Sequence, residues 1–194
     1  MELQGERLIP ARVEATWAAL NDPAVLKACI AGCESLEKTA ADAYTAVVAV
    51  KVGPVSARFK GNLQLTNIAA PNGYTINFDG QGGVAGFGKG SADVKLVPDG
   101  AQATKLSYQA RATVGGKMAQ VGARLIDAAA AKITDDFFKA FEAQLQAAAA
   151  PAEAAVATAP PPATAPERGG KVSTLWWLIA AVVVLAAIYV LMKR

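Results

Sequence analysis

Residues 103–146 read ATKLSYQARATVGGKMAQVGARLIDAAAAKITDDFFKAFEAQLQ, and the spacing of the apolar residues changes at Gly115 and Gly116. Before these glycines every second residue is apolar or small, which is typical of a β-strand with one polar face. After them apolar residues recur at every fourth position, which predicts a long helix over residues 118–146. The recurring residues are Val121, Leu125, Ala129, Ile133, Phe137 and Phe141. We expect this helix to pack on the inner face of the sheet to which the strand belongs.

The period of two extends back along the chain to Glu34. In each segment the charged side chains fall on one face and the apolar or small ones on the other. Turn residues such as Gly53 and Pro54 separate the segments. The predicted strands cover residues 43–52, 55–67, 74–82, 86–96 and 103–114. The pattern therefore predicts an antiparallel meander with one polar face.

The N-terminal part of the chain reads differently. Residues 3–9 form a short predicted strand that ends at Pro10, and apolar residues then recur at helical spacing from Val13 to Leu20. Pro23 begins a second short helix, which Gly32 ends. The fold class is therefore α+β, with an antiparallel sheet wrapped around a long C-terminal helix.

Many residues predicted to face the inside of this sheet are small. They are Ala46, Ala57, Gly61, Gly80, Gly88, Gly90, Ala92, Ala110 and Ala112. A filled core uses larger side chains at such positions. Two interpretations stand equally: the long helix approaches closely through its alanines at residues 128–131, or an apolar cavity lies between helix and sheet. Phe59, Phe78 and Tyr108 would line such a cavity.

The C-terminal part of the chain predicts a membrane anchor. Residues 172–192 read VSTLWWLIAAVVVLAAIYVLM without a charge, long enough as a helix to cross a hydrocarbon layer of about 30 Å. Trp176, Trp177 and Tyr189 are placed where headgroups would lie. Residues 149–171 are rich in alanine and proline, which predicts a linker. The expected organisation is a domain at 1–148, a linker at 149–171 and a transmembrane helix at 172–192.

Composition excludes several kinds of chemistry. The chain has no histidine, which removes a serine–histidine triad and the commonest metal ligand. Its two cysteines, Cys29 and Cys33, are better explained as core residues than as a zinc site. Cations and acids are nearly balanced over residues 1–150, and no basic run indicates a nucleic-acid surface. The acidic pair Asp135-Asp136 has lysines three or four residues away, which favours a solvated face over acid–base work.

The glycine-rich run at residues 80–90, GQGGVAGFGKG, approaches two phosphate-binding motifs. Both motifs need a strand before the glycines and a helix after them, so that the helix N-terminus meets the phosphate. Here the run lies between two predicted strands. We therefore interpret it as a hairpin, with the exposed Phe87 as a candidate lid over the open end of the sheet.

The order of predicted elements resembles the helix-grip fold of the START-like (SRPBCC) superfamily. Three stretches resemble the CoxG family of carbon monoxide dehydrogenase subunits more closely: ATWAALNDPAVLKACIAGCESLE at 15–37, VGPVSARFKGNLQL at 52–65 and VGGKMAQVGARLIDAAAAKITDDFF at 114–138. One departure is Ala31, where the family pattern has proline before Gly32. Linkers and terminal spans also occur in that family.

The resemblance implies a protein that is not an enzyme and carries no covalently bound cofactor. It implies a protein that attaches the molybdenum-containing CO dehydrogenase complex to the inner face of the bacterial cytoplasmic membrane, in a single pass with the domain on the cytoplasmic side. Its superfamily usually encloses an apolar cavity, which would hold a lipid or a quinone that links CO oxidation to the respiratory chain. The expected cavity residues are Phe59, Phe78, Phe87, Tyr108, Ala110, Leu125, Ala129, Ile133 and Phe137. A cyclase- or hydrolase-type enzyme, or an adaptor with a filled core, remains as an alternative. The ligand itself, the docking surface for the partner and the oligomeric state are not given by the sequence.

Overall fold

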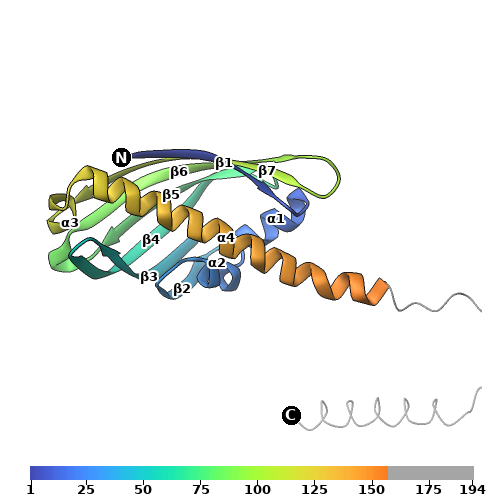
Figure 1. The fold of residues 1–194 in the computed structure, drawn as a ribbon, viewed down its shortest axis with the longest axis horizontal. Coiled ribbons are helices and arrows are strands. Elements are labelled where there is room, and N and C mark those ends of the chain that lie inside the picture. Colours follow the sequence, from blue (N-terminus) through green and yellow to red (C-terminus); the bar gives the residue numbers. More distant parts are fainter. Residues whose placement is uncertain (157–194) are drawn as a thin grey trace, which may run out of the picture. The chain divides into compact units, whose positions relative to one another are not determined.

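The fold is α+β, and a single seven-stranded antiparallel sheet forms most of it (Figure 1). This computed structural model describes the backbone of residues 1–156 and the side chains of residues 1–148. The strands are β1 (Glu2–Ile9), β2 (Cys33–Ala40), β3 (Ala43–Val52), β4 (Val55–Ala69), β5 (Gly73–Gln81), β6 (Phe87–Pro98) and β7 (Thr104–Gly115). The helices are α1 (Val13–Leu20), α2 (Pro23–Cys29), the short 3₁₀ helix η1 (Gly83–Ala85), α3 (Lys117–Gln120) and α4 (Ala123–Val156).

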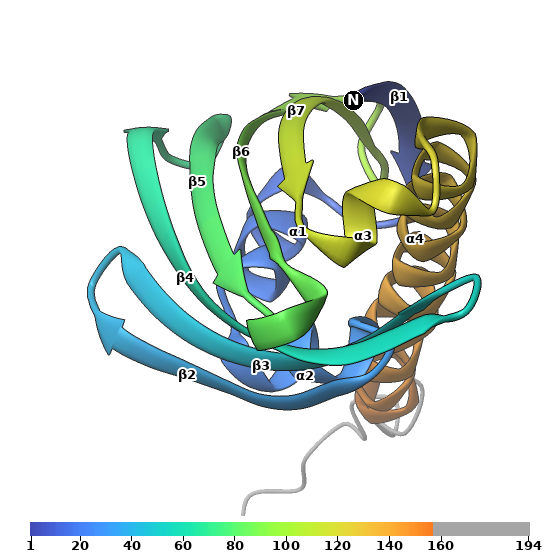
Figure 2. The ribbon, with the colours of Figure 1, turned by 90° about the vertical axis from the view of Figure 1, so that its left-hand side faces the viewer.

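The sheet is a meander closed by its first strand. Strands β2 to β7 pair in sequence order, and β1 pairs with β7, with Glu2 opposite Arg111. The sheet therefore has the order β1-β7-β6-β5-β4-β3-β2. It curls around an interior, and α4 runs along the open side between the β1 edge and the β3 side (Figure 2). This arrangement confirms the predicted antiparallel meander and the long helix that follows it.

The two faces of the sheet alternate as the sequence predicts. In β4, for example, Phe59 and Leu63 are half-buried on the inner face, whereas Lys60 and Asn62 are exposed on the outer one. The same alternation holds along β5, β6 and β7. It follows from the pleat, because successive side chains of a strand point to opposite faces.

The packed core lies at the end of the molecule that holds α1 and α2. Phe141 of α4 and Ile9 of β1 are fully buried there, together with Leu96 and Leu106 of β6 and β7. Trp17 of α1 meets Tyr74 edge to face with ring centroids 5.4 Å apart. The other end of the interior, toward η1 and α3, contains no comparable cluster among the described residues.

The long helix differs from the prediction at both ends. It is not continuous from residue 118, because Gly122 adopts a φ of 96° and separates α3 from α4. Few residues other than glycine adopt that conformation, so the break is encoded at this position. At the other end α4 continues to Val156, beyond the expected domain end at 148.

The packed face of α4 also differs from the predicted series of residues four apart. Four residues advance a side chain about 40° past a full turn, so the series drifts by about 160° between Phe141 and Leu125. Phe141 is fully buried, whereas Ile133 is 41% and Leu125 is 50% exposed. The expectation that the whole series packs on the sheet is therefore wrong for Leu125 and Ile133. Near the start of α4 the half-buried large apolar residue is Ile126 instead of Leu125.

The predicted transmembrane helix at 172–192 and most of the predicted linker lie outside the described residues. Within residues 1–156 no helix has the length and hydropathy needed to cross a bilayer.

Candidate functional site

A row of small residues crosses the inner face of the sheet at one level. The strand register aligns Ala46 of β3 with Gly61 of β4, Gly61 with Gly80 of β5, and Gly80 with Gly88 of β6. Residues that face each other across antiparallel strands point to the same side of the sheet. The row therefore removes side-chain bulk from one band of the interior, which we call the glycine row.

Open space lies over the β6 end of the glycine row. A Cβ atom built on Gly88 would meet no atom within 4 Å, and one on Gly80 would meet only strand backbone at 3.8 Å or more. Ala110 and Ala112 of the neighbouring strand β7 are only half-buried. These observations define open space on the inner face of the sheet beside Gly88, which we call the inner hollow, and they favour a cavity over close helix packing at this level.

Other glycines lie beneath aromatic rings instead of open space. A Cβ atom on Gly90 would lie 2.9 Å from Phe78 Cζ, and one on Gly82 would lie 2.7 Å from the Phe59 ring. Glycine at these positions lets a ring lie flat across the strand. Part of the small-residue pattern thus reflects aromatic packing, and only part reflects the inner hollow.

The predicted site residues on the sheet divide into two groups. Phe59 and Phe78 are half-buried on the inner face, each two residues along its strand from a member of the glycine row. Ala110 is half-buried too, but it pairs with Ala92, four residues along β6 from Gly88. Tyr108 is also half-buried, but it packs at the core end, with its ring 5.5 Å from that of Phe138. The structure therefore places Phe59 and Phe78 beside the glycine row, and Ala110 and Tyr108 farther along β7 toward the packed core.

The four predicted site residues on α4 lie at different angles around the helix. Phe137 is half-buried and stacks on Phe141 with ring centroids 5.8 Å apart. Ala129 is half-buried, and Leu125 and Ile133 are exposed on the flank of the helix. Their assignment to ligand binding stays a prediction.

Phe87 does not line the hollow. It alternates with Gly88, which faces inward, so its side chain lies on the outer face of the sheet. There its ring lies across Gly115, with Cζ 2.5 Å from the position of a Cβ atom on that glycine, and it is 36% exposed. The expectation that Phe87 lines the cavity is therefore wrong, and its role as a lid over the open end stays a prediction. The run at residues 80–90 does form a hairpin, with only a three-residue 3₁₀ helix at its tip.

Tyr44 and Tyr74, which the sequence analysis did not assign to the site, lie between the hollow and the packed core. Both are buried on the inner face in one cluster with Leu65. Tyr44 donates a hydrogen bond from its hydroxyl to the carbonyl oxygen of Asn21 at 3.3 Å. Burial, and then the neighbouring Tyr44, raises the pKa of Tyr74 far above that of free tyrosine. The inward parity of both tyrosines is visible in the sequence, but their clustering depends on α1.

Charged residues near the site are paired and lie toward solvent. Arg7 of β1 forms an ion pair with Asp135 of α4 and lies over the Phe138 ring, 5.5 Å from its centroid. Lys132 donates a hydrogen bond to Asp136 at 2.6 Å, which lowers the pKa of that carboxyl. The two carboxylates therefore belong to a solvated face, and no group of metal-ligand side chains occurs among the described residues.

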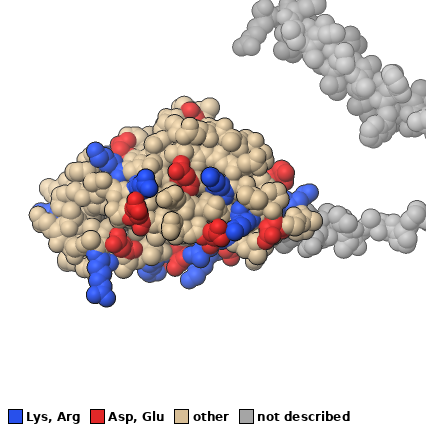
Figure 3. Space-filling model, turned by 90° about the horizontal axis from the view of Figure 1, so that it is seen from above, with Lys and Arg blue, Asp and Glu red and all other residues tan. Residues whose placement is uncertain are grey.

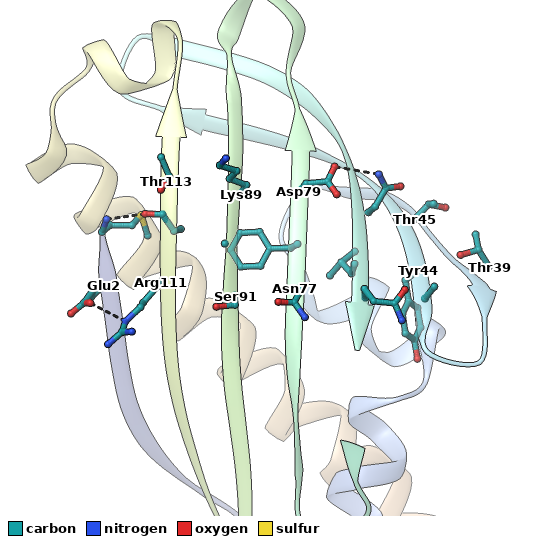
Figure 4. Close-up of a pocket in the computed structure, with 18 residues that line it drawn as sticks. Glu2, Thr39, Tyr44, Thr45, Asn77, Asp79, Lys89, Ser91, Arg111 and Thr113 are labelled. Carbon is teal, nitrogen blue, oxygen red and sulfur yellow. Dashed lines mark hydrogen bonds and ion pairs between the residues drawn. The ribbon is translucent and has the colours of Figure 1, made fainter. Parts of the chain in front are cut away.

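The outer face carries an open polar groove of about 860 Å³ (Figure 4). Arg111 forms an ion pair with Glu2 at 2.9 Å, and Asn62 donates a hydrogen bond to Asp79 at 3.2 Å. Lys89 and Ser91 lie beside them on β6. Figure 3 shows cations and acids interspersed over the visible surface and not separated by sign. This groove lacks the basic character of a nucleic-acid surface.

Residues 5–146 match the model of the carbon monoxide dehydrogenase CoxG family. This chain belongs to the CoxG family. The family resemblance of the sequence is thereby confirmed over most of the chain. CoxG is named as a subunit of CO dehydrogenase, and that description is the family's own. No functionally curated protein matches the sequence.

Solved structures place CoxG in the START-like fold. A conserved protein from Geobacillus kaustophilus is 32% identical with a TM-score of 0.71, and the match covers 75% of this chain and 95% of that one. A START superfamily protein from Mycobacterium smegmatis has 15% identity and a TM-score of 0.57, with 75% and 97% covered. The Zhui aromatase/cyclase from Streptomyces sp. R1128 has 12% identity and a TM-score of 0.58, with 75% and 93% covered. The last two show the fold alone.

The matched region forms one compact unit. The match covers 95% of the solved chain from Geobacillus kaustophilus. Contacts in this chain likewise separate residues 1–157 as one compact unit. A fragment of residues 1–156 is therefore a sound object for experiments on the domain.

Proposed function

We propose that this CoxG family member is a membrane-anchored subunit that recruits molybdenum CO dehydrogenase and holds an apolar molecule in the inner hollow. Its C-terminal span at 172–192 anchors it to the bacterial cytoplasmic membrane, with the domain on the cytoplasmic side. The bound molecule is a quinone or a lipid, held without a covalent bond. A quinone in this position links CO oxidation to the respiratory chain.

The observation that carries the proposal is the empty space over Gly88 at the end of the glycine row. Interiors are normally packed to the density of organic crystals, so side chains normally fill the space between a sheet and its helix. Here no atom lies within 4 Å of the position a Gly88 side chain would take. A ligand in that space would restore the missing contacts.

The lining argues for an apolar ligand. Around the glycine row the inner face presents half-buried carbon surface from Phe59, Leu63 and Phe78. Each methylene group that a ligand buries against such surface contributes about 0.8 kcal/mol. Among the described strands no carboxylate faces inward. Of the inward-facing cations, Arg7 is paired with Asp135, and the exposed Lys38 lies over the Tyr44 ring. The glycine row itself carries no charged side chain that would serve a charged ligand as a counter-ion.

The same lining supports a binding protein over an enzyme. Acid–base catalysis needs a titratable group within hydrogen-bond reach of the substrate. The chain has no histidine, and burial raises the pKa of Tyr74 still further above physiological pH. Proton transfer at neutral pH therefore lacks a suitable group among the inner-face residues of the described strands.

Titration of the fragment 1–156 with a short-chain quinone tests the ligand. Trp17 is the single tryptophan of this fragment, so its fluorescence reports binding. Gly88→Leu should abolish the response by filling the hollow, whereas Lys89→Leu, on the outer face of the same strand, should leave it unchanged. Equal affinities of the two variants would place the quinone outside the hollow, and no response in the parent fragment would remove the ligand from the proposal.

Deletion of residues 172–194 tests the anchor and the recruitment. In cells that express the deleted form, CO dehydrogenase activity should move to the soluble fraction and persist there with an artificial electron acceptor. Activity that stays with the membranes would contradict recruitment through this span.

A further inference from the structure

The inner hollow lies over Gly88, the second residue of β6, at the end of the sheet where η1 and α3 lie (Figure 2). Three segments surround this end: the β3–β4 turn, the η1 loop, and α3 with the first turn of α4. A Cβ atom on Gly116 would lie 2.5 Å from Gly86 Cα, so the α3 and η1 segments touch. Leu125 Cδ1 lies 3.7 Å from the Cβ position of Gly53, so α4 reaches the β3–β4 turn. We call residues 51–54, 82–86 and 116–125 the mouth rim.

The mouth rim presents apolar side chains to solvent. Val84, at the tip of η1, is 86% exposed, the largest exposed fraction among the large apolar side chains of the described residues. Leu125, across this end of the sheet, is 50% exposed. Exposed apolar side chains gathered beside an apolar cavity indicate a contact surface.

The mouth rim is also basic. It contains Lys51, Lys117 and Arg124 and no acidic residue. All three are exposed, and none forms an ion pair with another described residue. Elsewhere in the described part cations such as Lys105 and Arg111 are paired with acids on the neighbouring strand. The rim thus combines unpaired positive charge with exposed apolar side chains.

We propose that the mouth rim is a docking surface for an anionic lipid bilayer. Cations near such a surface are attracted by the negative headgroups, and apolar side chains between them enter the boundary with the acyl chains. A bilayer matches both features at once, because it offers anionic headgroups over apolar chains. Docking of this kind opens the hollow directly onto the acyl region, so that an apolar ligand enters without crossing water. The docking surface lies within the domain and is separate from the C-terminal span.

Sedimentation of the fragment 1–156 with vesicles tests this proposal without the C-terminal span. One set of vesicles is phosphatidylcholine, and the other is phosphatidylcholine and phosphatidylglycerol in equal parts. The fragment should sediment with the second set and much less with the first. Added salt should weaken the binding, because it screens surface charge.

Variants locate the docking surface. Removal of each rim cation should lower partitioning about fivefold, so Lys117→Gln and Arg124→Gln together give a larger loss than either alone. Val84→Asp should lower it about tenfold, because an apolar side chain no longer enters the bilayer. The matched controls are Val97→Asp and Lys95→Gln, at the far end of β6, where Val97 is 54% exposed. These controls should leave partitioning unchanged.

Several results would overturn the proposal. One is failure of the fragment to sediment with anionic vesicles, and another is an equal loss of partitioning in the control and rim variants. Loss of CO dehydrogenase co-purification in Val84→Asp, with unchanged vesicle binding, would make the rim a protein-docking surface instead. Quinone titration of the rim variants separates this proposal from the ligand proposal, because docking variants should keep the affinity measured without vesicles.

Discussion

Two glycines on the inner face of β6 should respond in opposite directions to the same added methyl group. A Cβ atom on Gly90 overlaps the carbonyl oxygen of Arg111 and lies 2.9 Å from Ala112 Cα. Both are backbone atoms that move only if β7 moves. We expect Gly90→Ala to lower the free energy of unfolding by about 1–3 kcal/mol, the range found for overpacked cores.

Gly88→Ala should instead leave the domain as stable or more stable. Its methyl group meets no atom within 4 Å, and its backbone lies outside the left-handed region. Replacing glycine at a compatible position raises the free energy of unfolding by about 0.4–1 kcal/mol, because the unfolded chain has less freedom to lose.

Thermal and urea unfolding of the fragment 1–156 measure both variants against the parent. In a domain of about 150 residues each kcal/mol moves the melting temperature by roughly 2–4 °C. Gly90→Ala should therefore melt clearly below the parent, and Gly88→Ala at or slightly above it. A loss of stability of the same size in both variants would show that the space over Gly88 is occupied, and it would refute the inner hollow.

Three further predictions concern side chains around the hollow and the core. The pKa of Tyr74 is raised in the folded state, so the protonated Tyr74 adds to the free energy of unfolding. This contribution is complete below the pKa of free tyrosine and is lost as the pH rises toward the folded value. Between pH 9 and strongly alkaline solution, the melting temperature of Tyr74→Phe should therefore fall less than that of the parent. A thiol reagent should modify Cys33 before Cys29, because Cys29 is only 3% exposed. Burial raises the pKa of both thiols, and Lys27 opposes that shift only at Cys33. Mass spectrometry that finds Cys29 modified first in the folded domain would contradict this packing. Ala110→Phe should weaken quinone binding with little change in melting temperature if its ring enters the hollow, and a fall of several degrees would show tight packing there instead.

The faces of the sheet could be predicted from sequence because a strand has a strict period of two. A charge such as Lys60 or Lys89 determines the direction of its neighbours, and no long-range contact is needed to assign them. The glycine row follows less directly. The sequence shows that its members are small and predicts that they face inward. Their alignment at one level depends on the strand register, which three separate turns determine together.

The helix was harder to orient from the sequence. A series of residues four apart looks continuous in the sequence, although it rotates steadily around a helix with 3.6 residues per turn. Phe137 and Phe141 lie on or near the packed face of α4, whereas Leu125 lies on an exposed side of the helix. The break at Gly122 adds to the difference, because a positive φ cannot be inferred from an isolated glycine in an otherwise helical pattern.

The meaning of each glycine could not be read from the sequence either. Gly88 and Gly90 have the same parity on the same strand, yet one lies under open space and the other under Phe78. The difference arises mainly from the β7 backbone, which approaches Gly90 closely at Arg111 and Ala112, and the Phe78 ring adds to it. Phe87 was misplaced for a related reason, since it was assigned by its position in a hairpin and not by its alternation with Gly88.

Photo-crosslinking with a short-chain quinone that carries a photoreactive group tests the central claim most directly. After irradiation of the fragment 1–156, peptide mapping identifies the labelled residues on β4, β5 and β6. The account predicts labels on inner-face residues such as Leu63 and Phe78, and loss of those labels in Gly88→Leu. Labels confined to outer-face neighbours on the same strands, such as Asn77 and Ser91, would contradict it.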